Sequence, residues 1–210
     1  MNKAKFITLE GGEGGGKSTQ AKKLAEFLRG RGLEVLLTRE PGGSPGAEDI
    51  RALLVSGEPG RWDAMTEALL HTAARRDHLQ RTVWPALETG TWVISDRYVD
   101  STVAYQGYGH ELGAERILEM HRIANDGFMP DLTLILDLPV EEGLGRANRR
   151  GGGEDRYERM KRDFHHRLRQ GFLQIAAHDP QRCRVVDASR NMDDVAARIQ
   201  HIATEKFGLA

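Results

Sequence analysis

The chain has 210 residues, of which 29% are charged and 39% hydrophobic, a composition typical of a globular protein in water. Thirty Lys and Arg residues against thirty-one Asp and Glu residues give a formal net charge of −1, so the overall charge does not favour nucleic acid or an anionic membrane as a partner. A single cysteine, Cys183, and the absence of any apolar run long enough to span a bilayer predict a cytoplasmic protein.

Short apolar runs alternate with longer segments of helical periodicity, which predicts one α/β domain over residues 1–210. The expected strands are 6–10, 35–39, 92–96, 132–137 and 184–187. The expected helices are 17–30, 46–55, 63–88, 113–125, 140–149, 154–177 and 191–206. Because strands such as 132–137 are apolar on both faces, we expect a three-layer fold, a five-stranded parallel sheet with helices on both faces.

The first expected strand leads into a glycine-rich segment that fits G-x-x-x-x-G-K-[ST] and opens a helix, the context of a P-loop. Glycines let the backbone wrap around phosphate, and the N–H groups at the helix start form an anion nest. Lys17 would place a cation on the β and γ phosphates, and the Ser18 hydroxyl would ligate Mg²⁺. The alternative, a glycine-rich turn with a solvated lysine, is disfavoured by the flanking strand and helix. The sequence therefore predicts a P-loop NTPase fold, with the triphosphate bound by Gly11, Gly12, Glu13, Gly14, Gly15, Gly16, Lys17, Ser18 and Thr19.

Several of the expected strands end in a charged residue, among them Glu10, Arg39, Asp96 and Asp137. Ligands of open parallel sheets bind beyond the carboxyl ends of the strands, so we expect the site at this edge. Asp137 has the position of a magnesium ligand, but Pro139 favours a role for it in capping the next helix.

A basic segment follows the fourth strand. Between residues 143 and 169 there are nine Arg or Lys residues and four Asp or Glu, and the segment contains three consecutive glycines at 151–153. Such a segment is either a mobile lid over an anionic ligand or a solvated helix with a loop, and charge alone favours the second interpretation.

Three further segments, taken together with the P-loop, resemble the thymidylate kinase family. They are Thr38-Arg-Glu-Pro-Gly-Gly43, then Asp96-Arg-Tyr98 with residues 101–107, and Glu154-Asp-Arg-Tyr-Glu158. The resemblance extends from the first strand to residues 185–189. It implies a nucleoside-monophosphate-kinase-like fold, transfer of the γ-phosphoryl group of ATP to dTMP with release of dTDP and ADP, Mg²⁺ as cofactor, and a homodimer.

The resemblance also implies an acceptor site. Arg39 and Arg97 would hold the acceptor phosphate, and two cations suit a dianion; the alternative for each is a structural salt bridge. Glu13 would contact the sugar hydroxyl. Tyr105 would crowd the 2′ position, unless it is only a half-buried core residue. The implied acceptor site comprises Glu13, Arg39, His71, Arg75, Arg97, Ser101, Tyr105 and Gln106, with Arg97 and Lys17 also catalytic.

His71 departs from the family pattern, and a second position, Gly14, separates two subtypes of the family. His71 stands where the family usually has a phenylalanine that stacks on thymine, beside Arg75 for a thymine carbonyl. An imidazole can stack, and we expect its ionisation to make dTMP binding depend on pH around ~6.5.

Some family members carry a catalytic arginine in the P-loop, where this chain has Gly14. A bacterial subtype supplies this arginine from the lid, which in this chain corresponds to about residues 143–157. The resemblance therefore implies Arg150, Arg149 or Arg156 as the catalytic arginine, and Asp96 as the partner of Ser18 at Mg²⁺.

Other functions remain open on the sequence alone. A P-loop kinase for another nucleoside monophosphate would differ only in its base contacts. A regulatory nucleotide-binding module has no evident need for Arg39, Arg97 and a basic lid, and the chain has no N-K-x-D segment. A structural domain with an inactive P-loop would show no turnover with any monophosphate.

Overall fold

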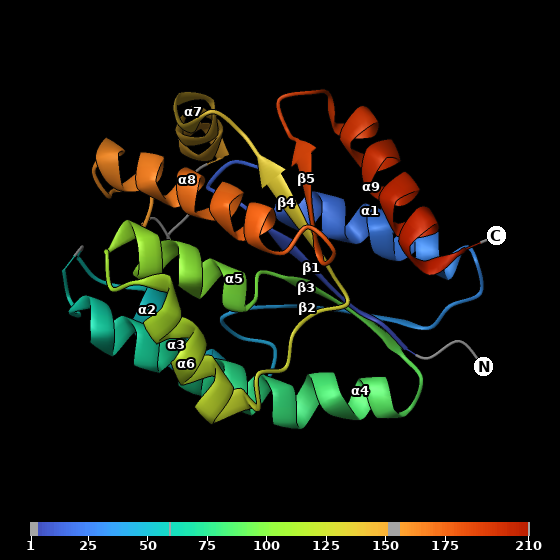
Figure 1. Ribbon diagram of the computed structural model, residues 1–210, viewed down its shortest axis with the longest axis horizontal. Coiled ribbons are helices and arrows are strands. Elements are labelled where there is room, and N and C mark those ends of the chain that lie inside the picture. The colour runs from blue at the N-terminus through green and yellow to red at the C-terminus, as the bar shows by residue number, and fades with distance from the viewer. Residues whose placement is uncertain (1–3, 59, 151–155, 210) are drawn as a thin grey trace.

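The structure, a computed structural model, describes residues 4–58, 60–150 and 156–209. A sheet of five parallel strands lies at its centre, in the order β2-β3-β1-β4-β5 (Figure 1). The strands are β1 (Phe6–Glu10), β2 (Val35–Arg39), β3 (Trp92–Asp96), β4 (Leu132–Asp137) and β5 (Cys183–Asp187). The predicted five-stranded parallel sheet is confirmed, and β5 begins one residue earlier than expected.

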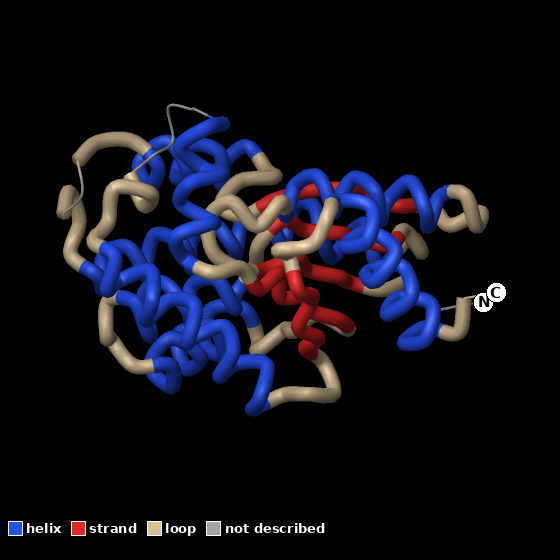
Figure 2. Tube along the Cα trace, turned by 90° about the horizontal axis from the view of Figure 1, so that it is seen from above, coloured by secondary structure: helices blue, strands red, loops and turns tan. Residues whose placement is uncertain are grey.

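Helices cover both faces of the sheet, as Figure 2 shows from above. On one face lie α1 (Lys17–Arg29) and α9 (Met192–Phe207). On the other lie α3 (Ala64–His78), α4 (Trp84–Glu88), α5 (Val99–Thr102), α6 (Ala114–Asn125) and α8 (Arg162–His178). Helix α2 (Pro45–Val55) packs on α3, and α7 (Val140–Arg150) follows the carboxyl end of β4.

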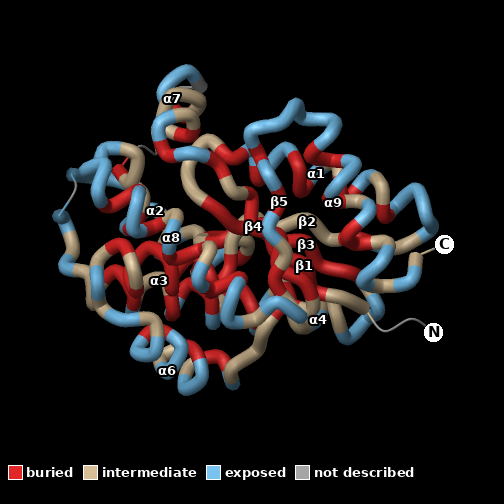
Figure 3. Tube along the Cα trace, turned by 45° about the horizontal axis from the view of Figure 1, so that its top comes forward, coloured by how far each residue is buried: buried red, intermediate tan, exposed pale blue. Residues whose placement is uncertain are grey.

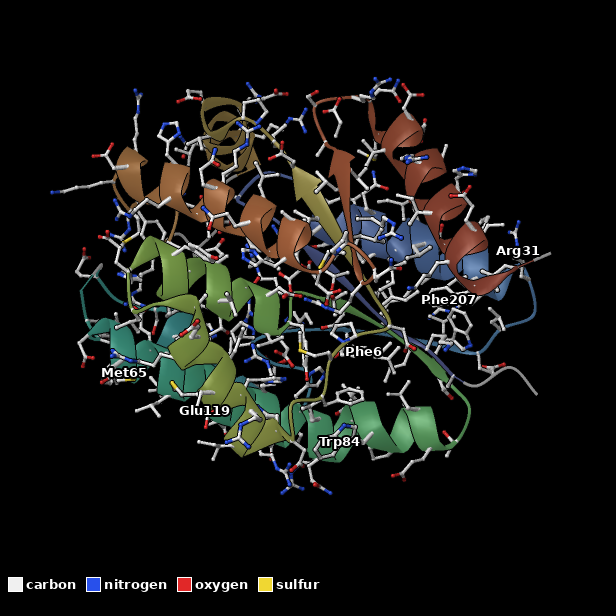
Figure 4. The ribbon with its side chains drawn as sticks, in the orientation of Figure 1. Phe6, Arg31, Met65, Trp84, Glu119 and Phe207 are labelled. Carbon is white, nitrogen blue, oxygen red and sulfur yellow. The ribbon has the colours of Figure 1, made fainter. Side chains whose placement is uncertain are left out.

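Alternate residues of the central strands enter two separate hydrophobic clusters, because both faces of the sheet are covered. Ile7 and Trp92 pack toward α1 and α9, and the Trp92 ring meets Phe207 at 5.0 Å between centroids. Phe6 points to the opposite face, where Trp84 also lies (Figure 4). In Figure 3 the three central strands, β3, β1 and β4, are accordingly buried along most of their length. The sheet is therefore a rigid support for the loops at its carboxyl edge.

The expected single helix 63–88 is three elements: α3, a π-helical turn η1 (Leu79–Val83) and α4. A second π-helical turn, η2 (Val103–Gly109), continues α5 and was not expected from the sequence. The α5–η2 segment is buried almost throughout, so it shows no amphipathic period. It carries Ser101, Tyr105 and Gln106 of the predicted site.

The helix expected at 154–177 begins only at Arg162, because residues 156–161 form turns and a bend. Positions 154 and 155, with the glycines at 151–153, lie outside the described residues. The ends of the other helices differ from expectation by at most one residue, within the usual uncertainty of helix ends.

Candidate active site

The loop after β1 has the backbone shape of a phosphate cradle. Gly11, Gly14 and Gly16 have φ angles of 129°, 69° and 81°, which side-chain-bearing residues rarely adopt. Gly16 occupies the N-cap of α1 and makes no side-chain capping bond. The N–H groups of the first turn of α1 are therefore available to an anion.

Lys17 lies in this cradle with a side chain that is almost fully buried. Its Nζ donates to the carbonyl oxygens of Gly11 at 3.2 Å and Gly12 at 2.7 Å. Burial, and next the charge of Arg97, lower the pKa of Lys17 to about 8. The amine is thus held where a phosphate would pair with it, with a reduced affinity for its own proton.

Ser18 and Asp96 meet at the edge where β1 and β3 lie side by side. The Ser18 hydroxyl donates to an oxygen of Asp96, the last residue of β3. A hydroxyl and a carboxylate beside a phosphate cradle are hard oxygen donors, the kind that Mg²⁺ takes together with substrate phosphates. The residues present therefore fit a magnesium ion.

Arg97 follows Asp96 and has a positive φ of 74°. Its guanidinium reaches back across the P-loop, where it donates to the Gly11 carbonyl and the Ser101 hydroxyl, both at 3.1 Å. It also donates to Glu13 at 3.1 Å and to the Tyr105 hydroxyl at 3.0 Å. The arginine predicted to hold the acceptor phosphate is thus fixed at the P-loop.

Glu13 and Tyr105 complete this cluster. The Tyr105 hydroxyl donates to Glu13 at 2.5 Å. Burial raises the pKa of Glu13, but the charges of Arg97 and Lys17 and the Tyr105 hydrogen bond outweigh it and lower that pKa to about 2. The carboxylate is therefore ionised at neutral pH and pairs with Arg97, and the charge of Lys17 stabilises it further.

Glu10 lies beneath the P-loop and supports this arrangement. It is fully buried and accepts hydrogen bonds from the Tyr98 N–H at 2.8 Å and the Ser101 hydroxyl at 2.5 Å. Burial, and next the charge of Asp100, raise the pKa of Glu10 to about 8. Its position clamps the turn that carries Arg97, a role that its place at the end of a strand could suggest but not specify.

One cavity of about 660 Å³ extends from the P-loop to α3, a volume within the range of small-molecule sites. It brings together the predicted acceptor residues and most of the P-loop: Glu13, Gly14, Gly15, Gly16, Lys17, Ser18, Thr19, Arg39, His71, Arg75, Asp96, Arg97, Ser101, Tyr105 and Gln106. Gly11 and Gly12 line a separate cavity of about 20 Å³ behind the loop.

Arg75 is buried and held from two sides. Its Nε donates to Glu40 at 2.8 Å and its Nη2 to the Thr102 hydroxyl at 2.9 Å. Glu40 also bonds His78 at 2.9 Å. An arginine fixed in this way presents its remaining donors to the cavity in one orientation.

His71 lies one helical turn before Arg75 and bonds the Tyr157 hydroxyl through Nε2 at 3.1 Å. Burial, and next the charges of Arg75 and Arg97, lower the pKa of His71 to about 3. The expectation that this imidazole titrates near pH ~6.5 is therefore wrong, because burial and the cations around the cavity keep it neutral.

Arg39, at the end of β2, and Gln106, on η2, also line the cavity. Arg39 donates to both oxygens of Glu48 at 3.0 Å and is half exposed. Gln106 is fully buried and donates to Glu67 at 3.1 Å.

The lid arginines occupy different surroundings. Arg156 is buried, donates to Glu67 and to the Leu54 carbonyl, and does not line the cavity. Arg149 is exposed on α7. The side chain of Arg150 lies outside the described residues.

Nine residues that line the cavity were not among the predicted site residues: Glu40, Pro41, Arg51, Val55, Tyr98, Thr102, Arg146, Tyr157 and Glu158. Arg146 donates to the Ala188 carbonyl at 2.9 Å and to Glu142 at 2.6 Å. In the sequence it shows only an i,i+4 pairing with Glu142, the pattern of a solvated helix face.

Asp137 does not take the capping role expected of it. Its two carboxylate oxygens accept from Arg169 at 2.7 and 2.8 Å, which joins β4 to α8.

The strand order, the phosphate cradle and the arginine-lined cavity beside it define a P-loop protein of the kinase class. The thymidylate kinase family model matches residues 9–199. The chain belongs to the thymidylate kinase family.

Comparisons with individual relatives support the same family. The chain is 50% identical to a thymidylate kinase of Caulobacter vibrioides over 209 residues, all of both chains. It is 52% identical to one of Rhizorhabdus wittichii over 196 residues, 93% of this chain and 94% of the relative. A crystal structure of thymidylate kinase from Ehrlichia chaffeensis matches with a TM-score of 0.77 and 33% identity, over 96% of this chain and 98% of that one. The predicted P-loop NTPase fold is thereby confirmed.

Among the described residues, no helix is both long and apolar enough to cross a membrane.

Proposed function

We propose that the protein transfers the γ-phosphoryl group of ATP to dTMP, forming dTDP and ADP in the cytoplasm. The observation that carries the proposal is the single cavity that joins Lys17 at the P-loop to Arg75 and His71 on α3. The donor phosphates would lie at one end of this cavity and the pyrimidine base at the other. The acceptor phosphate would then meet the γ-phosphate of ATP at Arg97. In-line transfer between two bound nucleotides needs this continuity, because the acceptor oxygen must be held against the γ-phosphorus that it attacks.

The acceptor half of the cavity suits a deoxynucleoside monophosphate. Arg97 and Arg39 offer cations to the phosphate, and they offset its repulsion from ATP. Tyr105 is tied to Glu13 and Arg97 and has little freedom to move away from a 2′-hydroxyl. A buried Arg75 provides donors for a base carbonyl.

For the metal, we propose that Ser18 and Asp96 hold Mg²⁺ together with the ATP phosphates. When bound, the ion would supply positive charge to the β and γ oxygens. The protein's own contribution is to orient the Ser18 hydroxyl and the Asp96 carboxylate, which already contact each other.

For the lid, we propose that residues 143–157 or so form a segment of this single domain that closes over ATP and supplies the catalytic arginine. Arg150 is the first candidate and Arg149 the second. The P-loop supports this assignment, since Gly14 contributes no cation there. Lys17 and backbone N–H groups alone would face the charge that gathers on the transferring phosphoryl group.

A homodimer completes the proposal. Helices α3 and α6 pack against each other, and each exposes large apolar side chains to solvent: Leu69 on the first, Leu118 and Ile123 on the second. Contact between two copies would cover them. Light scattering on the double variant Leu69→Lys, Ile123→Lys should give the monomer mass, and an unchanged dimer mass would refute this interface.

The deciding experiment for the activity is a coupled assay of ADP release with dTMP, dUMP, dCMP, dGMP and UMP. We expect dTMP to have the highest kcat/KM of the five. If another monophosphate is preferred, the kinase assignment stands and the acceptor is corrected. If none is phosphorylated, the protein is a binding module.

A further inference from the structure

Glu67 on α3 is a buried carboxylate at which two groups of residues meet. It is 2% exposed, and it accepts hydrogen bonds from Arg156, from the Tyr157 hydroxyl at 3.2 Å and from Gln106 at 3.1 Å. Arg156 and Tyr157 follow the glycines of the proposed lid. Gln106 and Tyr157 line the acceptor cavity. One side chain therefore contacts both the end of the lid and the wall of the site.

Arg156 is anchored rather than free to reach a phosphate. Besides Glu67, it donates to the Leu54 carbonyl at 2.9 Å and to the Glu58 carbonyl at 3.3 Å. Its side chain is 3% exposed. Removing the charge of Glu67 would leave a buried guanidinium without its counter-ion, which is among the more disruptive single changes in a protein interior.

Tyr157 extends this contact to the base end of the cavity. The hydroxyl of Tyr157 has one proton, which it donates to Glu67. Its oxygen must therefore accept a hydrogen bond from His71, so the Nε2 atom of His71 carries a hydrogen. Since His71 is neutral, its Nδ1 is left as an acceptor. The Tyr157 ring also meets Tyr105, with centroids 5.3 Å apart.

We propose that Glu67 is a positioning residue that couples the anchor of the lid, Arg156 and Tyr157, to the occupancy of the acceptor cavity. The coupling rests on the proposed function, because it takes a nucleoside monophosphate as the occupant. A base placed against His71 and Gln106 would fix the Gln106 amide and, through His71, the Tyr157 hydroxyl, and both of these groups donate to Glu67, so the carboxylate that pairs with Arg156 is held in place as well. By linkage, a firmly seated Arg156 favours acceptor binding to the same degree.

Tryptic cleavage after Arg156 reports the anchor directly, because trypsin must extract this buried side chain before it cuts. The initial rate of appearance of the fragment that begins at Tyr157 is measured by mass spectrometry, and cleavage after the exposed Arg31 serves as an internal reference. For Glu67→Gln without nucleotide, we expect this rate to rise by at least about tenfold. The matched control is Glu58→Gln, which removes a carboxylate from the exposed pair with Arg159 in the same region. It should change the rate by less than about twofold.

Saturating dTMP tests the coupling. In the wild-type protein it should slow cleavage after Arg156 by about fivefold or more. Tyr157→Phe retains the ring and the Glu67–Arg156 pair but loses the hydroxyl that joins Glu67 to His71. We therefore expect it to cleave at the wild-type rate without nucleotide and to lose most of the protection by dTMP. This variant preserves the core, so it remains informative even if Glu67→Gln fails to fold.

Steady-state kinetics separate positioning from general damage. Glu67→Gln should raise KM for dTMP more than it lowers kcat, and a double-mutant cycle with Arg156→Met should be strongly non-additive. Equal cleavage of wild-type and Glu67→Gln proteins, or full dTMP protection in Tyr157→Phe, would overturn the proposal. Turnover of dTMP by the wild-type protein tests the proposed function separately, since cleavage without nucleotide does not depend on the acceptor.

Discussion

Gly14 of the P-loop and Gly143 of α7 are in backbone contact. A Cβ atom added at Gly14 would overlap the Gly143 carbonyl oxygen, and one added at Gly143 would lie 2.6 Å from the Glu13 carbonyl oxygen. The helix that leads into the lid is therefore seated directly on the loop that holds phosphate. With a φ of 69° as well, position 14 could not take an arginine unless α7 moved, which agrees with a catalytic arginine from the lid.

The contact predicts opposite effects for the same substitution at two glycines of α7. Gly143→Ala should destabilise the protein by ~1–3 kcal/mol, because the methyl group meets backbone that cannot turn aside, and kcat should fall with it. Gly145→Ala faces open space and should stabilise the helix by ~0.5–1 kcal/mol. Urea unfolding and kcat measure both effects. Equal stabilities of the two variants would contradict the seating of α7.

ATP binding should take up a proton above neutral pH. Burial and Arg97 lower the pKa of Lys17 to about 8 in the free protein, and bound phosphates would raise it again. Affinity for ATP should thus fall as pH rises through about 8, with uptake of roughly half a proton at that pH. Calorimetry in buffers of different ionisation enthalpy measures the uptake. Lys17→Met should abolish it and lower kcat by at least about 10²-fold; identical uptake in that variant would exclude Lys17 as the source.

The pH dependence of dTMP binding should not involve His71. Burial, Arg75 and Arg97 lower its pKa to about 3, so the imidazole is neutral from about pH 5.5 to 8 and only gains a proton in strong acid. We therefore expect the ratio of dTMP KM between wild-type and His71→Phe proteins to be constant over that range. The acceptor phosphate titrates equally in both and cancels. A step in the ratio near pH ~6.5 would show that the ligand restores an ordinary imidazole.

Discrimination against ribose should depend on the ring of Tyr105. Tyr105→Ala removes the ring that we expect to crowd the 2′ position, so the preference for dUMP over UMP in kcat/KM should shrink. The pair shares one base, which isolates the sugar. Tyr105→Phe is the control: it keeps the ring, loses the bonds to Glu13 and Arg97, and should keep the preference while lowering kcat. An unchanged preference in Tyr105→Ala would place the discrimination elsewhere.

If the lid arginines act in the transition state, their removal should lower kcat and kcat/KM together. For Arg149→Ala combined with Arg150→Ala, we expect a loss on the order of 10³-fold in kcat with little change in KM for ATP. The double variant Arg149→Lys, Arg150→Lys keeps both charges and tests the need for a planar fork. If KM for ATP rises in the alanine variant while kcat holds, the two arginines only bind ATP in its ground state.

The strands and the P-loop could be predicted from the sequence because their signals are local: a run of apolar residues, a glycine spacing, a strand before and a helix after. The residues that line the cavity were largely identified through the family resemblance. Helix α5 and η2 were missed because a segment buried on every side has no polar face to reveal its period.

The features of the site that no local pattern showed have a common physical origin in long-range pairing. Arg156 looked like a lid cation, but it pairs with Glu67, 89 residues earlier in the chain. Burial and then Arg75, one turn along α3, lower the pKa of His71, and Arg97 and Arg156, which no local pattern connects to α3, lower it further. Asp137 was expected to cap a helix and instead pairs with Arg169.

The π-helical turn at Val103–Gly109 makes the acceptor site sensitive to chain length as well as to residue identity. A π turn holds one residue more than an α turn between the same end points, and each residue of an α-helix rotates the chain by about 100°. Deleting one residue there would rewind the segment as an α-helix and turn Tyr105 or Gln106 out of the cavity, although every remaining side chain would be unchanged. Variant libraries aimed at new acceptors should therefore hold the number of residues in this segment constant while they change its composition.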